Sequence, residues 1–295
     1  MAVVRRSSIV IAAVGLTIGA LAAAQVPGIA AGALLHPSRR RVEVGPPAGC
    51  GDATFAGEMV SLRGWRCRAG GARRGTLVYL HGIADNRTSA AGVIARFAPR
   101  GFDVVAYDSR AHGESDGAAC TYGFFEKEDL RRVVDALEPG PLALIGTSLG
   151  AAVALQHAAR DPRIRTVVAA EAFSDLRTVA TERAPIFLPA PLVDRAFRRA
   201  EAEGHFTVDA VSPAEAARAI TVPVMVIHGA ADSDTPPDHA RRVFAALAGP
   251  KKLILVPAAR HNESLNGEIW TEIERWIDAA VPIDADVARR ELRRR

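Results

Sequence analysis

The sequence predicts an α/β fold, with a mostly parallel central sheet flanked by helices and a helical cap insertion. Strand-like and helix-like runs alternate from residue 58 to residue 280, which is typical of parallel strands joined by helices. The short apolar runs "VMVIH" (224–228) and "LILVP" (253–257) do not alternate with polar residues. Such runs indicate strands that are covered on both faces. A length of 295 residues is compatible with one compact domain of this class.

The individual elements follow in chain order. A hairpin is expected around Gly64, and further strands are expected at 76–80, 103–107, 142–145, 165–170, 222–228 and 253–256. Helical spacing of apolar residues predicts helices at 89–98, 124–137, 149–159, 238–247 and 268–279. Residues 173–219 interrupt this alternation with helical fragments among prolines, and we interpret them as a cap over one edge of the sheet.

The N-terminal segment, residues 1–36, contains a long apolar stretch. Arg5 and Arg6 precede residues 9–35, which carry no charged side chain. As a helix this stretch is long enough to cross a hydrocarbon core of about 30 Å and to serve as a retained anchor. Alternatively, residues 9–21 are the apolar region of a secretory signal that is cleaved after 22–24. Both interpretations predict a membrane-anchored or secreted protein with an extracytoplasmic catalytic domain, joined by a linker at 37–57. A buried helix of a soluble domain is the third interpretation of this stretch.

Charge and cysteine content limit the class of partner. The net charge of +4 owes much to the basic tail at 281–295, and no aromatic-basic pattern accompanies it, so we expect no nucleic-acid partner. The three cysteines have no metal-ligand spacing. An exported domain allows one disulfide and leaves one thiol over, and proximity in sequence favours the pair Cys50 and Cys67; three unpaired thiols are an equal alternative. The sequence does not specify an oligomeric state.

A serine stands at a sharp corner of the chain. The stretch "LALIGTSLGAAVAL" changes from a predicted strand to a predicted helix at Gly146-Thr147-Ser148-Leu149-Gly150. The pattern G-x-S-x-G between a strand and a helix is typical of a strained turn that exposes the serine hydroxyl. The glycines are needed because a β-carbon at either position would collide with neighbouring backbone. Ser148 is therefore the candidate nucleophile.

A serine nucleophile needs a base and an acid that orients the base. Asp232 follows the strand predicted at 222–228, and His261 follows the strand predicted at 253–256, so the chain order is serine, acid, histidine. Asp234 is the alternative acid. His228 and His239 are expected to be structural.

The turn after the strand at 76–80 is the candidate second half of an oxyanion hole. In "YLHGIADN" Gly82 permits a close backbone approach, and we expect the N–H groups of Ile83 and Leu149 to face the same oxygen. His81 and His112 precede the serine, which disfavours them as the base. The polar loop at 108–115 is expected to form structural hydrogen bonds beneath the site.

Taken together, "HGIADN", "YDSRAHGES", "GTSLG", "HGAADSDTPP" and "RHNES" resemble the serine hydrolases of the α/β-hydrolase superfamily. The similarity covers residues 58–279 and is greatest to prolyl-oligopeptidase-related and acyl-ester-hydrolase-like proteins, although the β-propeller of the large peptidases is missing. The resemblance implies Ser148 as nucleophile, Asp232 as acid, His261 as base and Ile83 with Leu149 as oxyanion donors. It also implies no cofactor and no metal.

The expected activity is cleavage of the carboxylic ester of a small acyl substrate through an acyl-enzyme. An amidase or peptidase, a thioesterase, and a non-hydrolytic enzyme that retains the triad are alternatives on the same residues. A catalytically silent binding protein is an alternative from a different class, because a fold does not fix a function.

Overall fold

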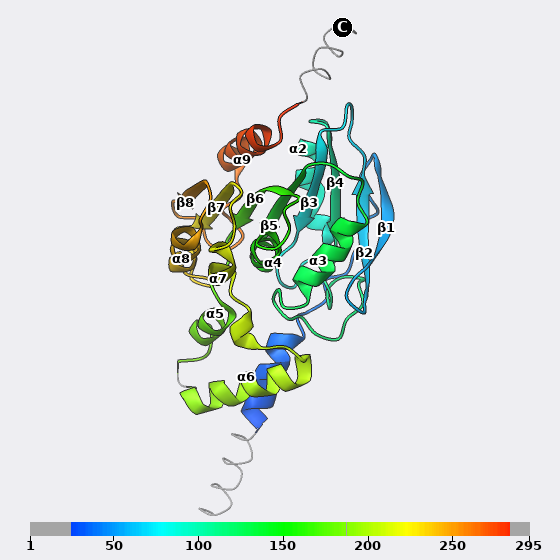
Figure 1. Ribbon diagram of the computed structural model, residues 1–295. Coiled ribbons are helices and arrows are strands. Elements are labelled where there is room, and N and C mark those ends of the chain that lie inside the picture. Colours follow the sequence, from blue (N-terminus) through cyan, green and yellow to red (C-terminus); the bar gives the residue numbers. More distant parts are fainter. Residues whose placement is uncertain (1–24, 187, 284–295) are drawn as a thin grey trace, which may run out of the picture.

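The computed structural model describes residues 25–186 and 188–283, and a mixed β-sheet runs through the centre of that part of the chain (Figure 1). The strands of these residues are β1 (Cys50–Ala56), β2 (Ser61–Cys67), β3 (Gly75–Leu80), β4 (Phe102–Tyr107), β5 (Leu142–Thr147), β6 (Ile164–Ala170), β7 (Val224–Gly229) and β8 (Lys251–Val256). They form one sheet in the order β1-β2-β4-β3-β5-β6-β7-β8. Pairing is parallel from β4 to β8 and antiparallel at β1 and β2. The predicted fold class, a mostly parallel sheet flanked by helices, is confirmed.

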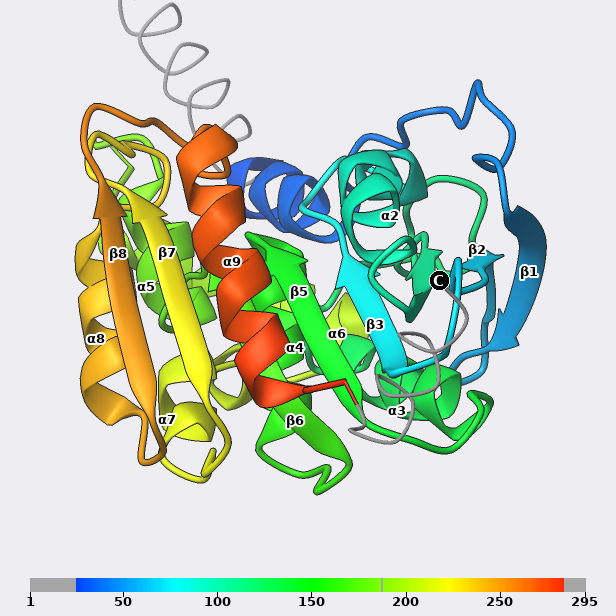
Figure 2. The ribbon, with the colours of Figure 1, turned by 90° about the horizontal axis from the view of Figure 1, so that it is seen from above.

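Helices cover both faces of this sheet (Figure 2). They are α2 (Ala91–Phe97), α3 (Glu126–Asp135), α4 (Leu149–Ala158), α5 (Leu176–Glu182), α6 (Ala190–Gly204), α7 (Pro213–Ala217), α8 (Asp238–Ala246) and α9 (Gly267–Ala280), with 3-10 turns η1 (Arg87–Ala90) and η2 (Val208–Ala210). Alternate strand residues divide the core: Val78 and Leu144 pack with α3, α4 and α8, whereas Leu77 and Ile145 pack with α2 and α9. Strands β3, β4 and β7 are buried at every residue, which explains why their sequences are mainly apolar and do not alternate with exposed polar residues.

The N-terminal hairpin differs from its predicted position. Strand β1 lies inside the segment expected as a linker, and its residues pair in register with β2 up to the turn at 57–60. Of the seven β1 residues only Phe55 is buried, so the strand lacks the apolar pattern that would have marked it. Gly64 lies within β2 rather than at the turn. A β-carbon there would stand 2.6 Å from the carbonyl oxygen of Ala106 on β4, so close strand packing requires the glycine.

Cys50 and Cys67 face each other across the two edge strands and form a disulfide. Cys120 is buried and free. The pairing favoured by sequence proximity is therefore confirmed, and the alternative of three unpaired thiols is wrong. The disulfide closes the β1–β2 hairpin at its open end.

Residues 25–35 form a helix that packs on the domain. Ala31 and Leu35 are buried, the Cys120 N–H donates to the Leu35 carbonyl, and the Tyr122 hydroxyl donates to the Leu34 carbonyl at 3.0 Å. The predicted anchor or signal falls largely on residues 1–24, which lie outside the described residues, as does most of the predicted tail at 281–295. None of the helices in 25–186 and 188–283 combines the length and apolarity that a membrane span requires.

The predicted cap insertion begins at the end of β6 and returns to the sheet at β7. Helices α5 and α6 lie beside the helix at 25–35, away from the sheet (Figure 1). The last helix of the insertion, α7, behaves differently, because its Ala217 belongs to the main core beneath the sheet. The cap proper is thus formed by α5, α6 and the N-terminal helix together.

Candidate active site

Ser148 occupies the turn between β5 and α4 in a left-handed backbone conformation, with φ of +48°. A β-carbon at Gly146 would lie 2.4 Å from the backbone of Gly150, and one at Gly150 would lie 2.1 Å from the Leu80 carbonyl oxygen. The Ser148 N–H donates to the Ala170 carbonyl on β6 at 2.8 Å. The strained turn is therefore fixed by close backbone packing, as the sequence pattern predicts.

His261 lies between the predicted nucleophile and the predicted acid. Its Nε2 is 3.1 Å from Ser148 Oγ, and its Nδ1 is 2.7 Å from Asp232 Oδ2. A carboxylate only accepts hydrogen bonds, so Nδ1 carries the proton and Nε2 is free to accept the serine proton. His261 thus joins Ser148, which lies 113 residues earlier in the sequence, and Asp232, which lies 29 residues earlier, in one chain of hydrogen bonds.

Asp232 is held by its own loop. Its Oδ1 accepts the N–H groups of Asp234 and Thr235, each at 2.9 Å, and His228 Nε2 lies 3.2 Å from Oδ2. Burial by itself raises the pKa of Asp232. Hydrogen bonds from His228 and His261 outweigh burial, so the pKa lies below its usual value and the acid is ionised at neutral pH. The alternative acid, Asp234, is exposed and contributes its backbone rather than its carboxylate.

The two predicted oxyanion donors flank the same serine. Leu149 is the first residue of α4, so its N–H has no acceptor within the helix, and the helix dipole favours negative charge there. A β-carbon on Gly82 would lie 3.6 Å from the Ser148 β-carbon, which places the turn after β3 beside the serine. Among the described residues no protein acceptor takes the N–H of Ile83. Both N–H groups are available to a ligand oxygen.

His81 ties this turn to the loop at 108–115. Its Nε2 accepts the Ser109 N–H at 2.9 Å, so Nδ1 carries the proton and donates to the Gly82 carbonyl at 2.7 Å. Burial lowers the pKa of His81, which keeps the ring neutral. His112 packs edge-on against it, 5.2 Å between ring centroids. Both histidines are structural, as expected from their place in the chain.

The polar loop at 108–115 supports the site from below. Buried Asp108 accepts the Arg87 N–H at 2.7 Å and the Glu114 N–H at 2.9 Å, and pairs with the Arg87 guanidinium. Arg110 pairs with Asp129 at the start of α3 at 2.7 Å. These contacts are the structural hydrogen bonds that the sequence predicts for this loop.

Sequence reasoning missed a second carboxylate beside the histidine. Glu171 directly follows β6, is 2% exposed, and has a positive φ of 58°. Its two oxygens accept the N–H groups of Asn262 at 2.6 Å and Ser264 at 3.1 Å, and one lies 3.9 Å from His261 Nδ1. Glu171 therefore fixes the loop that carries His261. The one sequence feature that could have indicated this role is that Glu171 directly follows a predicted buried strand.

His228, near the end of β7, and His239, at the start of α8, have structural partners, as predicted. His228 Nε2 donates to the Thr235 carbonyl at 2.7 Å, within the acid loop. His239 accepts the Ser174 N–H on one nitrogen and contacts Glu182 with the other. Across 25–186 and 188–283, no three His, Cys, Asp or Glu side chains gather so as to hold a metal ion.

A sequence model of proteins with the alpha/beta hydrolase fold matches residues 75–196. The chain has the α/β-hydrolase fold. The matched stretch contains Ser148 and ends before Asp232 and His261, so their roles depend on the geometry above.

The chain also resembles solved structures and curated proteins. It aligns with an esterase of Pyrococcus furiosus at a TM-score of 0.66 and 23% identity, covering 84% of this chain and 97% of that one. It aligns with an acylaminoacyl peptidase of Pyrococcus horikoshii at a TM-score of 0.60 and 13% identity, covering 80% of this chain and 43% of that one. Among curated proteins, the uncharacterized YqkD of Bacillus subtilis is 30% identical over 196 residues, 63% of this chain and 64% of that protein. The match to YqkD thus spans less than two thirds of its length.

Proposed function

We propose that the protein is a serine hydrolase that cleaves carboxylic esters through an acyl-enzyme, with Ser148, His261 and Asp232 as the triad. The observation that carries this proposal is the hydrogen-bonded chain from Ser148 Oγ through His261 to Asp232, at 3.1 and 2.7 Å. The α/β-hydrolase fold, shared with an esterase, supports it. No step of this reaction requires a cofactor.

In the acylation step, His261 Nε2 accepts the Ser148 proton as Oγ bonds to the ester carbonyl carbon. The carbonyl electron pair moves to oxygen, and the resulting oxyanion accepts hydrogen bonds from the N–H groups of Ile83 and Leu149. The oxyanion then re-forms the carbonyl and expels the alcohol oxygen, which takes the proton from His261. Ionised Asp232 stabilises the imidazolium that exists between these two transfers.

Water then completes the cycle. His261 Nε2 takes one proton from the water as its oxygen bonds to the acyl carbon. The second oxyanion collapses, the bond to Ser148 Oγ breaks, and Oγ recovers the proton from His261. The products are the carboxylic acid and the free enzyme, so protons and electron pairs balance over both steps.

The first test is hydrolysis of p-nitrophenyl butanoate by the full-length protein and its Ser148→Ala variant. We expect kcat to fall by about 10⁴-fold or more, because serine and histidine in such a triad act as a unit. Ser61→Ala, at the start of β2 and away from the triad, is the matched control and should retain full activity. Equal turnover by wild type and Ser148→Ala would refute the proposal.

Amide hydrolysis is a second candidate, since the fold is shared with an acylaminoacyl peptidase. The same residues would act, with an amine as leaving group. Parallel kcat/KM values for p-nitrophenyl butanoate and an acylaminoacyl p-nitroanilide separate the two activities. A higher value for the anilide would assign the protein to the peptidases.

We also propose that the hydrolase domain works outside the cytoplasm. The Cys50–Cys67 disulfide supports this location, because such bonds persist in oxidising compartments. Residues 9–21, the candidate apolar region of a secretory signal, support export. Residues 25–35 do not, because they pack on the domain. Acylation of lysine residues on intact cells by a membrane-impermeant biotin N-hydroxysuccinimide ester tests the location. Labelling only after lysis would place the domain inside.

A further inference from the structure

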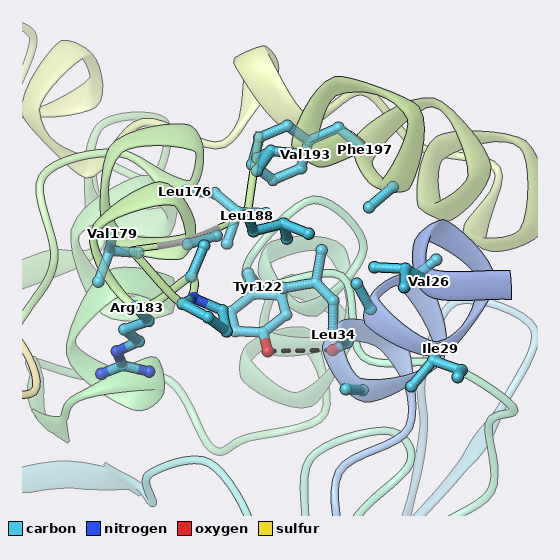
Figure 3. A pocket seen from close by; sticks show the side chains of 17 residues that line it. Val26, Ile29, Leu34, Tyr122, Leu176, Val179, Arg183, Leu188, Val193 and Phe197 are labelled. Carbon is cyan, nitrogen blue, oxygen red and sulfur yellow. Dashed lines mark hydrogen bonds between the residues drawn. The ribbon is translucent and has the colours of Figure 1, made fainter. Parts of the chain in front are cut away.

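An apolar cavity of about 530 Å³ lies between the helix at 25–35, α5 and α6 (Figure 3). Val26, Ile29 and Leu34 line it from the N-terminal helix, whereas Val179 and Phe197 line it from the cap. The family match begins at residue 75, so one wall of this cavity comes from a segment outside the matched region. Its volume lies in the range of sites that bind small molecules.

The two polar side chains that line the cavity already have partners. The Tyr122 hydroxyl donates to the Leu34 carbonyl at 3.0 Å (Figure 3). The Arg183 guanidinium donates to the Asp234 carbonyl and to Thr235 Oγ1, each at 2.7 Å. What the cavity offers a ligand is therefore mainly apolar contact, which suits a hydrocarbon chain rather than a polar group.

The walls of the cavity are held in place. The N-terminal helix is bonded to Tyr122 through Leu34. Directly after the helix, the ring of His36 contacts the Ala118 carbonyl and the Glu203 carboxylate, each at 2.8 Å. Glu203 belongs to α6, so the helix and the cap are joined directly. At the rim Ile29 is 69% exposed, an apolar side chain facing solvent at the entrance. The cavity walls are thus held by hydrogen bonds, and the cavity is open to solvent on one side.

Contacts link the cavity to the triad. Arg183 bonds to Thr235, whose N–H in turn holds Asp232. Ala152, one helical turn after Ser148, belongs to the same buried cluster as Ala31 of the N-terminal helix. Ser148 itself does not line the cavity, but these contacts place the cavity wall directly against the helix that follows the nucleophile.

We propose that this cavity binds the acyl chain of the ester substrate, so that the N-terminal helix is part of the substrate site. The inference rests on the proposed ester hydrolysis and adds its substrate class, esters of medium- to long-chain fatty acids. Burial of one methylene group changes kcat/KM by a factor of about four at full burial. Because the cavity is open on one side, we expect kcat/KM to rise by at least about tenfold from butanoate to decanoate.

Two measurements on the full-length protein test the inference. The first is kcat/KM for p-nitrophenyl acetate, butanoate, octanoate and decanoate. The second, which needs no turnover, is calorimetric titration of the protein with dodecanoate and with butanoate. Each is made on wild type, on Ala33→Trp and Val193→Trp, which fill the cavity from its two sides, and on Ala202→Trp. Ala202 is exposed on α6 and does not line the cavity, so its variant is the matched control.

We expect dodecanoate to bind wild type and Ala202→Trp more tightly than butanoate does. Both cavity-filling variants should lose most of this binding and at least about tenfold in the ratio of decanoate to acetate kcat/KM. Ala202→Trp should keep both values within about twofold of wild type. A wild-type kcat/KM that does not rise with chain length, together with absent dodecanoate binding, overturns the inference. A cavity filled by another part of the chain would give that result.

The two proposals fail in different ways. If dodecanoate binds and Ala33→Trp abolishes its binding while no ester is cleaved, the cavity assignment stands and the proposed hydrolysis fails. If acetate is cleaved at a rate that depends on Ser148 but dodecanoate does not bind, the hydrolysis stands and the cavity assignment fails.

Discussion

Replacing Glu171 by glutamine tests how His261, the proposed base, is held. The carboxylate accepts two backbone N–H groups, from Asn262 at 2.6 Å and Ser264 at 3.1 Å. A glutamine amide has one oxygen, so one N–H would face the NH₂ group instead. A hydrogen bond to a charged group contributes about 1.5–3 kcal/mol, so the free energy of unfolding should fall by about 2–4 kcal/mol.

The same substitution should lower catalysis. Asn262 holds a positive φ of 66° directly after His261, so release of its N–H lets the loop relax away from the serine. A displacement of about 1 Å from productive geometry costs about 10²-fold in rate. We therefore expect Glu171→Gln to lower kcat for p-nitrophenyl butanoate by about 10- to 100-fold at a temperature where the variant is folded.

The assay combines urea unfolding with steady-state kinetics. The matched control is Glu182→Gln, because Glu182 contacts His239 and not the loop that carries His261. This variant should keep full kcat. A Glu171→Gln variant that loses stability but keeps wild-type kcat would refute the reasoning, because Glu171 would then support the fold without positioning His261.

Three further outcomes follow from the geometry. Asp232→Asn should lower kcat by about 10⁴-fold, whereas Asp234→Asn should stay within about twofold, as measured with p-nitrophenyl butanoate; the opposite order would make Asp234 the acid. Burial and the neighbouring His81 lower the pKa of His112 to about 4. As the pH falls below about 6.5, the His112 ring is therefore protonated in the unfolded chain but not in the folded chain. The free energy of unfolding should fall by up to about 3 kcal/mol from pH 6.5 to pH 4, and it should fall less steeply in His112→Asn. Gly150→Ala should fail to fold or unfold at a lower Tm in a thermal melt, since its β-carbon would stand 2.1 Å from a β3 carbonyl oxygen, and an unchanged Tm would contradict the packing described.

The sequence predicted the parts of the site that have a local pattern. Ser148 stands in G-x-S-x-G between a strand and a helix, and Asp232 and His261 follow apolar strands in the expected order, so their meeting at one edge of the sheet follows from parallel topology. Glu171 has no such pattern. Its role arises from the approach of a loop some ninety residues later in the chain, which spacing along the sequence does not encode.

The N-terminal region shows why an apolar sequence alone does not distinguish a membrane helix from a helix packed on the protein. Residues 25–35 are as uncharged as the stretch before them, but Leu35 is fully buried against the domain, and the helix lines a cavity. A helix that is apolar on most sides packs equally well against lipid or against protein. Strand β1 was missed for the opposite reason, since an edge strand that buries one residue leaves almost no hydrophobic signal.

Phosphonylation of the folded protein by a fluorophosphonate, followed by peptide mapping, tests the acyl-enzyme assignment most directly. We predict one adduct per chain, located on Ser148, and loss of the adduct in Ser148→Ala and in His261→Gln. An adduct on a different serine, or none on a chain that is shown to be folded by circular dichroism, would contradict the assignment.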